Sequence, residues 1–398
     1  MRDVLDAILE WYSAGRTFGL ATVVSTFRSA PREPGASMAV SADGEVVGSV
    51  SGGCVEGAVY ETARQVMESG LPVLEKYGVS DDDAFAVGLT CGGILHVFVE
   101  PVDRRTFPEL AEVAAAVAGR RPVAVATVVT VPGAAGGPGA GGGPGPDGGP
   151  GAEGGSGAGA ASVVAGARRV IWPDRASGTL GAEGLDVAVD DDARGMLAQG
   201  VTGERHYGRH GERRMDEVAV FVRSFAPPPR MLVFGAIDFA AAVARVGKFL
   251  GYHVTVCDAR GVFATRKRFP DADEVLVRWP HQYLRETEVD GRTVICVLTH
   301  DPKFDVPLLE VALRTPAGYV GAMGSRRTHD DRMKRLREAG LTEEELGRLR
   351  SPIGLDIGAR TPEETAVSIA AELTQNRWGG TGMPLSRTEG RIHGTAAP

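Results

Sequence analysis

Two cysteines, each beside a pair of glycines, are the residues in this sequence best suited to chemistry. Cys54 ends the run Ser51-Gly52-Gly53-Cys54, and Cys91 precedes Gly92 and Gly93. Unpaired main-chain N–H groups at a helix start favour an anion and so make a thiolate available to a soft metal or a sulfur atom. Glycines let a bulky ligand approach the main chain closely. Our hypothesis is one site that uses both cysteines; the alternative is a purely structural role, with Cys54 as a small apolar residue that caps a turn.

The other two cysteines have a different setting. Cys257 and Cys296 lie within apolar runs typical of buried strands, which predicts two core thiols. Four cysteines without paired spacing form neither a disulfide framework nor a CxxC zinc site.

A partial dinucleotide fingerprint follows the apolar strand Met231–Phe234. Gly235 opens it, and Asp258 ends the next predicted strand, 23 residues further on. In the motif G-x-G-x-x-G/A the glycines let a pyrophosphate approach a helix start. Ile237 replaces the second glycine, and Asp238 adds negative charge. We therefore expect a Rossmann-like fold whose binding of a nucleotide such as NAD(P) is weakened or altered.

A third candidate lies at a basic helix start near the C-terminus. Gly324 and Ser325 lead into Arg326 and Arg327, whose guanidinium groups suit a phosphate or a carboxylate. The alternative is a solvated helix face. Further on, Thr361 and Glu364 form a predicted capping box, with Pro362 at the first helical position.

The predicted secondary structure that carries these residues differs before and after Pro227-Pro228-Pro229. Before this stiff segment, short strands and three amphipathic helices are predicted; after it, strands and helices alternate. Alternation of this kind is typical of a doubly wound parallel sheet. We therefore predict an α/β protein with a mixed α/β domain at 1–227 and a Rossmann-like domain at 228–398, with a mobile tail from about 378.

One tract interrupts the first domain. Residues 133–159 contain 15 glycines and 4 prolines and no large apolar side chain. Such a composition cannot bury enough surface to become ordered, so we predict a flexible insert at about 133–160. Because strand patterns flank the tract at 122–131 and 162–172, we interpret it as an enlarged hairpin loop rather than a domain boundary.

Composition excludes several classes of function. The chain has 398 residues and a formal charge of −8, which disfavours nucleic acid as a partner. It contains no apolar stretch of roughly 18 to 20 residues and no apolar signal core, so no membrane association and a cytoplasmic location are expected. We find no serine-hydrolase elbow and no paired Cys/His spacing for zinc or iron.

Six segments together match the motifs of one known family. They are Ala30-Pro31-Arg32 with Gly35 and Met38, Gly48–Glu56, Gly88–Gly93, the strand around Leu232, Tyr319–Arg326 and Pro352–Ala359. The two cysteine segments and the last run are specific, whereas the fingerprint is not. The chain resembles the XdhC/CoxI family, accessory factors that mature molybdenum hydroxylases such as xanthine dehydrogenase and carbon-monoxide dehydrogenase.

The resemblance implies a chaperone rather than an enzyme. An XdhC/CoxI-type domain would precede a Rossmann domain, often in a homodimer. The chain would bind the molybdenum cofactor (molybdopterin), support its sulfuration with a cysteine desulfurase, and insert it into an apo molybdenum hydroxylase. Arg326 and Arg327 would hold the pterin phosphate. The family often carries Gly-x-Gly where this chain has Ile237, and the Gly-rich insert is unusual and expected to be dispensable.

Residue by residue, the motifs and the resemblance predict one set of ligands. Cys54 and Cys91 are the predicted metal ligands. The predicted cofactor-binding residues are Ser51, Gly52, Gly53, Cys54, Cys91, Gly92, Gly93, Gly235, Asp258, Gly324, Ser325, Arg326 and Arg327.

Two other classes of function remain open. One is an NAD(P)-dependent oxidoreductase that uses the second domain; tight NAD(P)H binding with saturable turnover would favour it. The other is a scaffold that binds the apo-hydroxylase without cofactor, which a preparation free of metal and pterin from a cofactor-replete host would favour.

Overall fold

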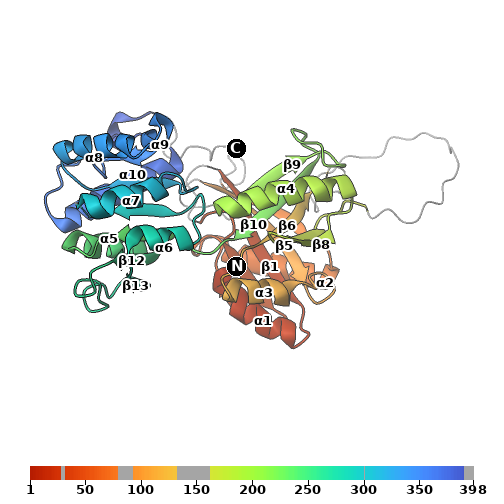
Figure 1. Cartoon of the computed structure of the whole chain (residues 1–398). Helices are drawn as coiled ribbons and strands as arrows, with labels where there is room; N and C mark the ends of the chain where they lie inside the picture. The colour runs from red at the N-terminus through yellow and green to blue at the C-terminus, as the bar shows by residue number, and fades with distance from the viewer. Residues whose placement is uncertain (28–31, 79–92, 132–161, 300, 390–398) are drawn as a thin grey trace, which may run out of the picture. The chain divides into compact units, whose positions relative to one another are not determined.

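Two structural units, Met1–Pro227 and Pro228–Pro398, divide the chain (Figure 1). The computed structural model describes residues 1–27, 32–78, 93–131, 162–299 and 301–389. The Gly-rich tract 133–159 and Cys91 lie outside the described residues. Across the described ranges, no helix is both long and apolar enough to cross a membrane.

Within its described ranges, unit 1 contains two five-stranded sheets in which all neighbouring strands pair antiparallel. The first has the order β3-β2-β1-β5-β4, and the second has the order β8-β7-β6-β10-β9. The first is formed by β1 (Phe18–Phe27), β2 (Ser37–Ser41), β3 (Val46–Gly48), β4 (Val73–Gly78) and β5 (Ile94–Val102). The second is formed by β6 (Val123–Thr130), β7 (Arg168–Ile171), β8 (Ala176–Thr179), β9 (Gly203–Tyr207) and β10 (Val218–Phe225).

Four α-helices cover the sheets of unit 1 in the residues that the structure describes. Helix α2 (Glu56–Ser69) packs on β1, β2 and β5, and α4 (Glu183–Gln199) packs on β6, β7 and β10. Helices α1 (Leu5–Ser13) and α3 (Leu110–Ala118) contact each other and share one apolar cluster with both sheets; a short 3-10 helix, η1 (Arg2–Val4), precedes α1. Helices therefore bury the outer faces while the inner faces of the two sheets meet.

Side chains in these strands alternate between two buried environments. In β1, Ala21 and Val23 belong to the apolar cluster under α2, whereas Thr22 and Val24 face the space between the sheets. The same alternation in β10 turns Arg223 into that space. Because both faces are covered, strands β1, β6 and β10 are nearly continuous apolar runs in the sequence.

The predicted enlarged hairpin is confirmed by the pairing of its flanking strands. Strand β6 pairs antiparallel with β7, with Ala124 opposite Ile171 and Thr127 opposite Arg168. The Gly-rich tract thus connects neighbouring strands of one sheet.

Unit 2 has one parallel sheet with the order β13-β12-β11-β14-β15-β16, which confirms the predicted doubly wound arrangement. Its strands are β11 (Arg230–Phe234), β12 (His253–Asp258), β13 (Glu274–Val277), β14 (Val294–Val297), β15 (Tyr319–Ala322) and β16 (Leu349–Arg350). Its helices are α5 (Asp238–Phe249), α6 (Pro280–Glu286), α7 (Pro302–Ala312), α8 (Arg326–Glu338), α9 (Glu343–Gly347), α10 (Pro362–Trp378) and the 3-10 helix η2 (Leu385–Arg387).

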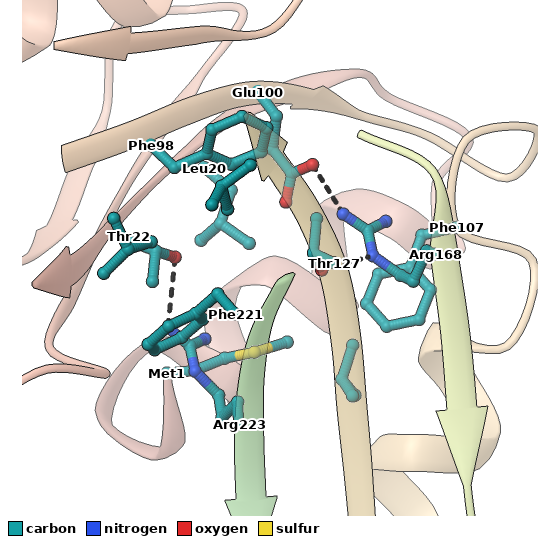
Figure 2. A pocket seen from close by; sticks show the side chains of 13 residues that line it. Met1, Leu20, Thr22, Phe98, Glu100, Phe107, Thr127, Arg168, Phe221 and Arg223 are labelled. Carbon is teal, nitrogen blue, oxygen red and sulfur yellow. Dashed lines mark hydrogen bonds and ion pairs between the residues drawn. The ribbon is translucent and has the colours of Figure 1, made fainter. Parts of the chain in front are cut away.

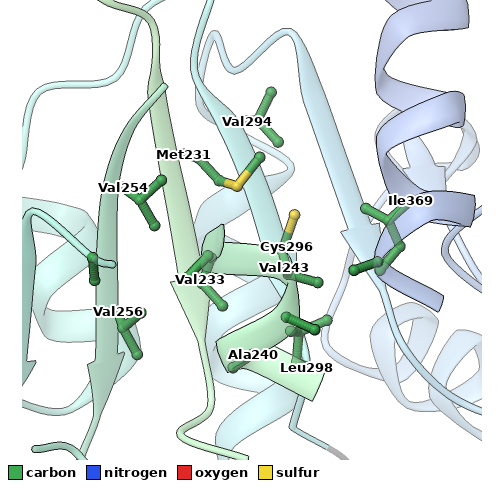
Figure 3. Close-up of a cluster of buried hydrophobic side chains, with 14 of the residues drawn as sticks. Met231, Val233, Ala240, Val243, Val254, Val256, Val294, Cys296, Leu298 and Ile369 are labelled. Atoms are coloured by element: carbon green, nitrogen blue, oxygen red, sulfur yellow. The ribbon is translucent and has the colours of Figure 1, made fainter. Parts of the chain in front are cut away.

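Each face of this sheet carries its own apolar core. Helices α5 and α10 cover one face, where strand residues such as Val233 and Cys296 lie beside Val243 and Ile369 (Figure 3). Helices α6 to α9 contribute to the cluster on the other face. The predicted capping box is present at the start of α10, with Pro362 in its first turn. The described part of the predicted tail runs from this helix through η2 to residue 389.

Candidate functional site

The loop between β3 and α2 carries the first predicted site and is organised by one carboxylate. Glu56, the first residue of α2, folds back over the loop and accepts hydrogen bonds from two hydroxyls and four main-chain N–H groups. These donors are Ser49 Oγ at 2.6 Å, Ser51 Oγ at 2.6 Å, and the N–H groups of Ser51 at 2.9 Å, Gly52 at 3.0 Å, Gly53 at 2.9 Å and Val55 at 3.2 Å. Burial by itself would raise the pKa of Glu56, but these hydrogen bonds lower it to about 2.

This arrangement corrects one prediction about the loop. We expected unpaired N–H groups beside Cys54, available to an anion on a ligand. Instead, the N–H groups of Gly52 and Gly53 are paired with Glu56, and that of Cys54 donates to Ser51 Oγ at 2.9 Å. The physical reason is local: glycines with positive φ curve the main chain around a point that the carboxylate of Glu56 can reach. The chain's own carboxylate therefore fills the anion-binding position.

The outer side of the same loop is exposed in the described part of the chain. Gly52 and Gly53 are both exposed, and a Cβ atom added to either would meet no atom of a described residue within 4 Å. Both glycines have φ in the region that L side chains rarely adopt, at +83° and +123°. Cys54 is half-buried against the apolar cluster under α2. The loop thus presents bare main chain and a thiol at one surface, which fits a bulky, soft ligand.

The second cysteine of the predicted pair is not described. Cys91 and Gly92 lie outside the described residues, so their pairing with Cys54 stays a prediction. Gly93 is buried directly before β5, and Gly78 pairs with Ile94 across β4 and β5. Leu95, two residues after Gly93, belongs to the apolar cluster on which Cys54 packs. The described chain therefore resumes at Gly93, next to that cluster.

In unit 2, main-chain groups of the fingerprint loop are also hydrogen-bonded to the chain's own side chains. Asp258, only 3% exposed, accepts a hydrogen bond from the N–H of Ala236 at 2.7 Å. Arg260 pairs with the same carboxylate at 2.8 Å, while Arg268 contacts Asp238 at 3.0 Å and the carbonyl of Ala236 at 3.0 Å. Burial would raise the pKa of Asp258, but the contacts with Arg260 and Ala236 lower it.

The roles predicted for Gly235 and Asp258 change accordingly. Gly235 has φ of +109°, and an added Cβ would lie 2.7 Å from Thr299, so glycine is required by packing there. Asp258 holds the loop and Arg260 rather than presenting a free carboxylate to a ribose. Ile237 packs against the core under α5. Weakened nucleotide binding stays a prediction, and these contacts give it a physical reason.

The basic helix start is the most open of the predicted positions. Ser325 caps α8 by accepting from the N–H of Thr328 at 3.2 Å, and it follows Gly324 at the carboxyl end of β15. The side chains of Arg326 and Arg327 are exposed and make no hydrogen bond or ion pair with any described residue. By contrast, Arg332 on the same helix is buried and pairs with Asp305 at 2.9 Å. Arg326 and Arg327 are thus free to meet an anion.

The prediction of two core thiols is confirmed. Cys257 and Cys296 are 1% and 0% exposed, and burial raises the pKa of each thiol to about 12. No group of three or more His, Cys, Asp or Glu side chains that could hold a metal ion occurs among the described residues.

Sequence analysis missed the residues whose importance depends on long-range contacts. Glu56 is one of them. An acidic residue at a helix start that follows two serines and two glycines is a sequence signal for a carboxylate that accepts hydrogen bonds from its own loop. Arg223 stands inside the apolar run Val218–Phe225, where a charged residue needs a partner or a function.

Comparisons with known proteins agree with this architecture. A model of the XdhC and CoxI family matches residues 11–78, and a model of the XdhC Rossmann domain matches residues 231–373. The chain therefore belongs to the XdhC/CoxI family and has its Rossmann domain.

Two relatives align over nearly the whole chain. A probable xanthine dehydrogenase subunit from Bacillus subtilis is 26% identical over 376 residues, which cover 94% of this chain and 96% of the relative. The molybdenum cofactor insertion chaperone PaoD from Escherichia coli is 24% identical, with 94% and 88% covered. The crystal structure of a xanthine dehydrogenase from Bacillus halodurans shares the fold, with a TM-score of 0.60, 23% identity, and 94% and 95% covered.

Proposed function

We propose that this protein is a chaperone that holds the molybdenum cofactor and inserts it into an apo molybdenum hydroxylase. The observation that carries the proposal is the Gly52–Cys54 loop, where a half-buried thiol adjoins exposed main chain, and a Cβ atom added to either glycine would meet no atom of a described residue within 4 Å. This loop lies in the part of the chain that matches the XdhC/CoxI model. A full-length relative named as a molybdenum cofactor insertion chaperone supports the same function.

The cofactor is cargo in this proposal, and each predicted site has its own chemistry toward such a ligand. A thiolate at Cys54 is a soft ligand for the metal end, and the two glycines leave room for the pterin. Arg326 and Arg327 can bind a phosphate through their guanidinium groups. Cys91 is proposed as the second thiol, and a cysteine desulfurase and a second copy of the chain as further partners.

Substitution of Cys54 tests the proposal directly. We expect Cys54→Ser to reduce molybdenum bound to the protein purified from a cofactor-replete host, because a hydroxyl is a much poorer soft-metal ligand than a thiolate. The measurement is elemental analysis of molybdenum per chain, with circular dichroism to verify the fold. Cys257→Ser is the matched control, since that thiol lies in the core of unit 2.

The outcomes separate the proposal from its alternatives. Loss of molybdenum in Cys54→Ser but not in Cys257→Ser supports a carrier that uses Cys54. Unchanged molybdenum in both variants contradicts the assigned site. A wild-type protein that co-purifies with a hydroxylase but contains neither metal nor pterin would instead favour a scaffold.

A further inference from the structure

A small cavity between the two sheets of unit 1 is lined by charged side chains (Figure 2). Glu100 of β5, Arg168 of β7 and Arg223 of β10 line it together with aromatic and aliphatic residues. Its volume of about 20 Å³ has room for one occupant the size of a water molecule. The exposed fractions of the three charged residues are only 7%, 9% and 7%.

The charges around this inter-sheet cavity do not cancel. Arg168 forms an ion pair with Glu100 at 2.5 Å and donates to Thr127 Oγ1 at 3.4 Å. These three side chains, two arginines and one glutamate, have a net charge of 2 − 1 = +1 and are almost fully buried. Burial is costly for a charge that lacks a counterion, so the excess positive charge requires compensation.

Arg223 is the side chain that carries the excess. It donates to the hydroxyls of Thr22 and Ser37, each at 3.0 Å, and no carboxylate lies within ion-pair distance of it in the described parts of the chain. Its Nε is buried without a hydrogen-bond partner. Burial lowers the pKa of Arg223 to about 10, which still leaves the guanidinium charged at neutral pH.

The neutral groups around the cavity also lack an acceptor. The hydroxyls of Thr22 and Thr127 accept hydrogen bonds from the two arginines, so each has its own proton left to donate. For these two protons no acceptor is found among the described residues. Donors therefore outnumber acceptors at this site, as they do in sites that bind anions.

We propose that the inter-sheet cavity binds one monovalent anion of halide size. Such an ion supplies the missing negative charge and accepts hydrogen bonds from Arg223 and the threonine hydroxyls. A water molecule matches the volume but does not balance the charge, whereas a halide ion is a compact acceptor that does both. The bound ion would hold the two sheets of unit 1 together.

Diffraction from the unmodified full chain tests the site directly. Crystals grown with sodium bromide should show an anomalous bromine peak in the cavity, within hydrogen-bond distance of Arg223. An ordered water without anomalous signal at that position, or an empty cavity, would overturn the proposal.

Thermal unfolding of variants gives an independent test. For the full chain, bromide should raise the melting temperature relative to sodium gluconate at equal ionic strength, since gluconate is too large for the cavity. A site with a dissociation constant of about 1 mM would give a rise of roughly 5 to 10 °C at about 100 mM bromide. Equal melting temperatures in the two salts would contradict the proposal.

Two substitutions should change this bromide effect in opposite directions. Arg223→Met removes the excess charge and should abolish it, whereas Glu100→Gln adds net positive charge and should let it saturate at a lower bromide concentration. Arg213→Met, at an exposed arginine paired with Asp191 and Asp192, is the control that should retain the wild-type effect. An undiminished effect in Arg223→Met would overturn the assignment of Arg223.

Discussion

Glu56 shows how a single residue can change the chemistry of a loop. Its carboxylate accepts six hydrogen bonds from the segment Ser49–Val55, so it fixes the path of the chain up to Cys54. The thiol is thereby held at the edge of the apolar cluster under α2. We regard Glu56 as a positioning residue for Cys54 rather than a ligand.

Replacing this carboxylate should destabilise unit 1. Glu56→Gln keeps one acceptor oxygen but turns an NH₂ group towards N–H and O–H donors, so we expect a loss of about 1–3 kcal/mol in the free energy of unfolding at pH 7. Denaturant unfolding measures it. Glu61→Gln, at an exposed position on the same helix, is the control and should have almost no effect.

The effect should depend on pH in a defined direction. The pKa of Glu56 is about 2 in the folded chain, below the value near 4.3 expected when unfolded. Its stabilisation is therefore complete above about pH 5 and is lost as the pH falls towards 2. The difference between wild type and Glu56→Gln should shrink over that interval; a constant difference would show that Glu56 does not act through its charge.

At the scale of elements, the first strand–loop–helix of unit 2 has the topology of a dinucleotide site with altered chemistry. The N–H of Ala236, which would face a pyrophosphate in the standard motif, is taken by Asp258. Ile237 adds a branched side chain where the motif has glycine. The strand and the helix are those of a Rossmann domain, but the N–H of Ala236 in the loop between them is already hydrogen-bonded within the chain.

We therefore expect weak binding of reduced dinucleotides. NADH or NADPH titrated into the full chain should give no saturable change in nicotinamide fluorescence up to about 1 mM, the upper end of ordinary substrate affinities. Micromolar binding accompanied by turnover would support the oxidoreductase alternative instead.

At the scale of the whole molecule, the topology of unit 1 makes the Gly-rich tract a connection between neighbouring strands. Strands β6 and β7 are held by their own ladder and by hydrogen bonds of Val128 with Gly166 and Ala167. The tract is therefore not needed to bring the two strands together.

Shortening the tract should leave the protein folded and functional. Replacement of residues 133–159 by about eight Gly and Ser residues should change the free energy of unfolding by less than about 1 kcal/mol, in the stabilising direction, because a shorter loop loses less entropy on closure. Molybdenum content should stay at the wild-type level. A clear fall in the free energy of unfolding or in the molybdenum content would show that the tract has a role in folding or in cofactor binding.

Local sequence patterns were sufficient to predict the helices and strands and the α/β fold class. Alternating strand and helix patterns predicted the parallel sheet of unit 2, and turn, capping and cysteine motifs predicted α10, the hairpin of β6 and β7, and the thiol loop. These features depend on residues close together in the chain, where local conformational preferences and periodic burial decide the outcome.

The hydrogen bonds between distant polar groups, by contrast, depend on the tertiary fold. Thr22 and Arg223 are 201 positions apart and contact each other only because two sheets stack face to face. Likewise, the N–H groups of Gly53 and Ala236, which could otherwise bind an external anion, donate hydrogen bonds to Glu56 and Asp258. Electrostatic and hydrogen-bond energies fall steeply with distance and depend on burial, so they are fixed by three-dimensional placement and not by residue type alone.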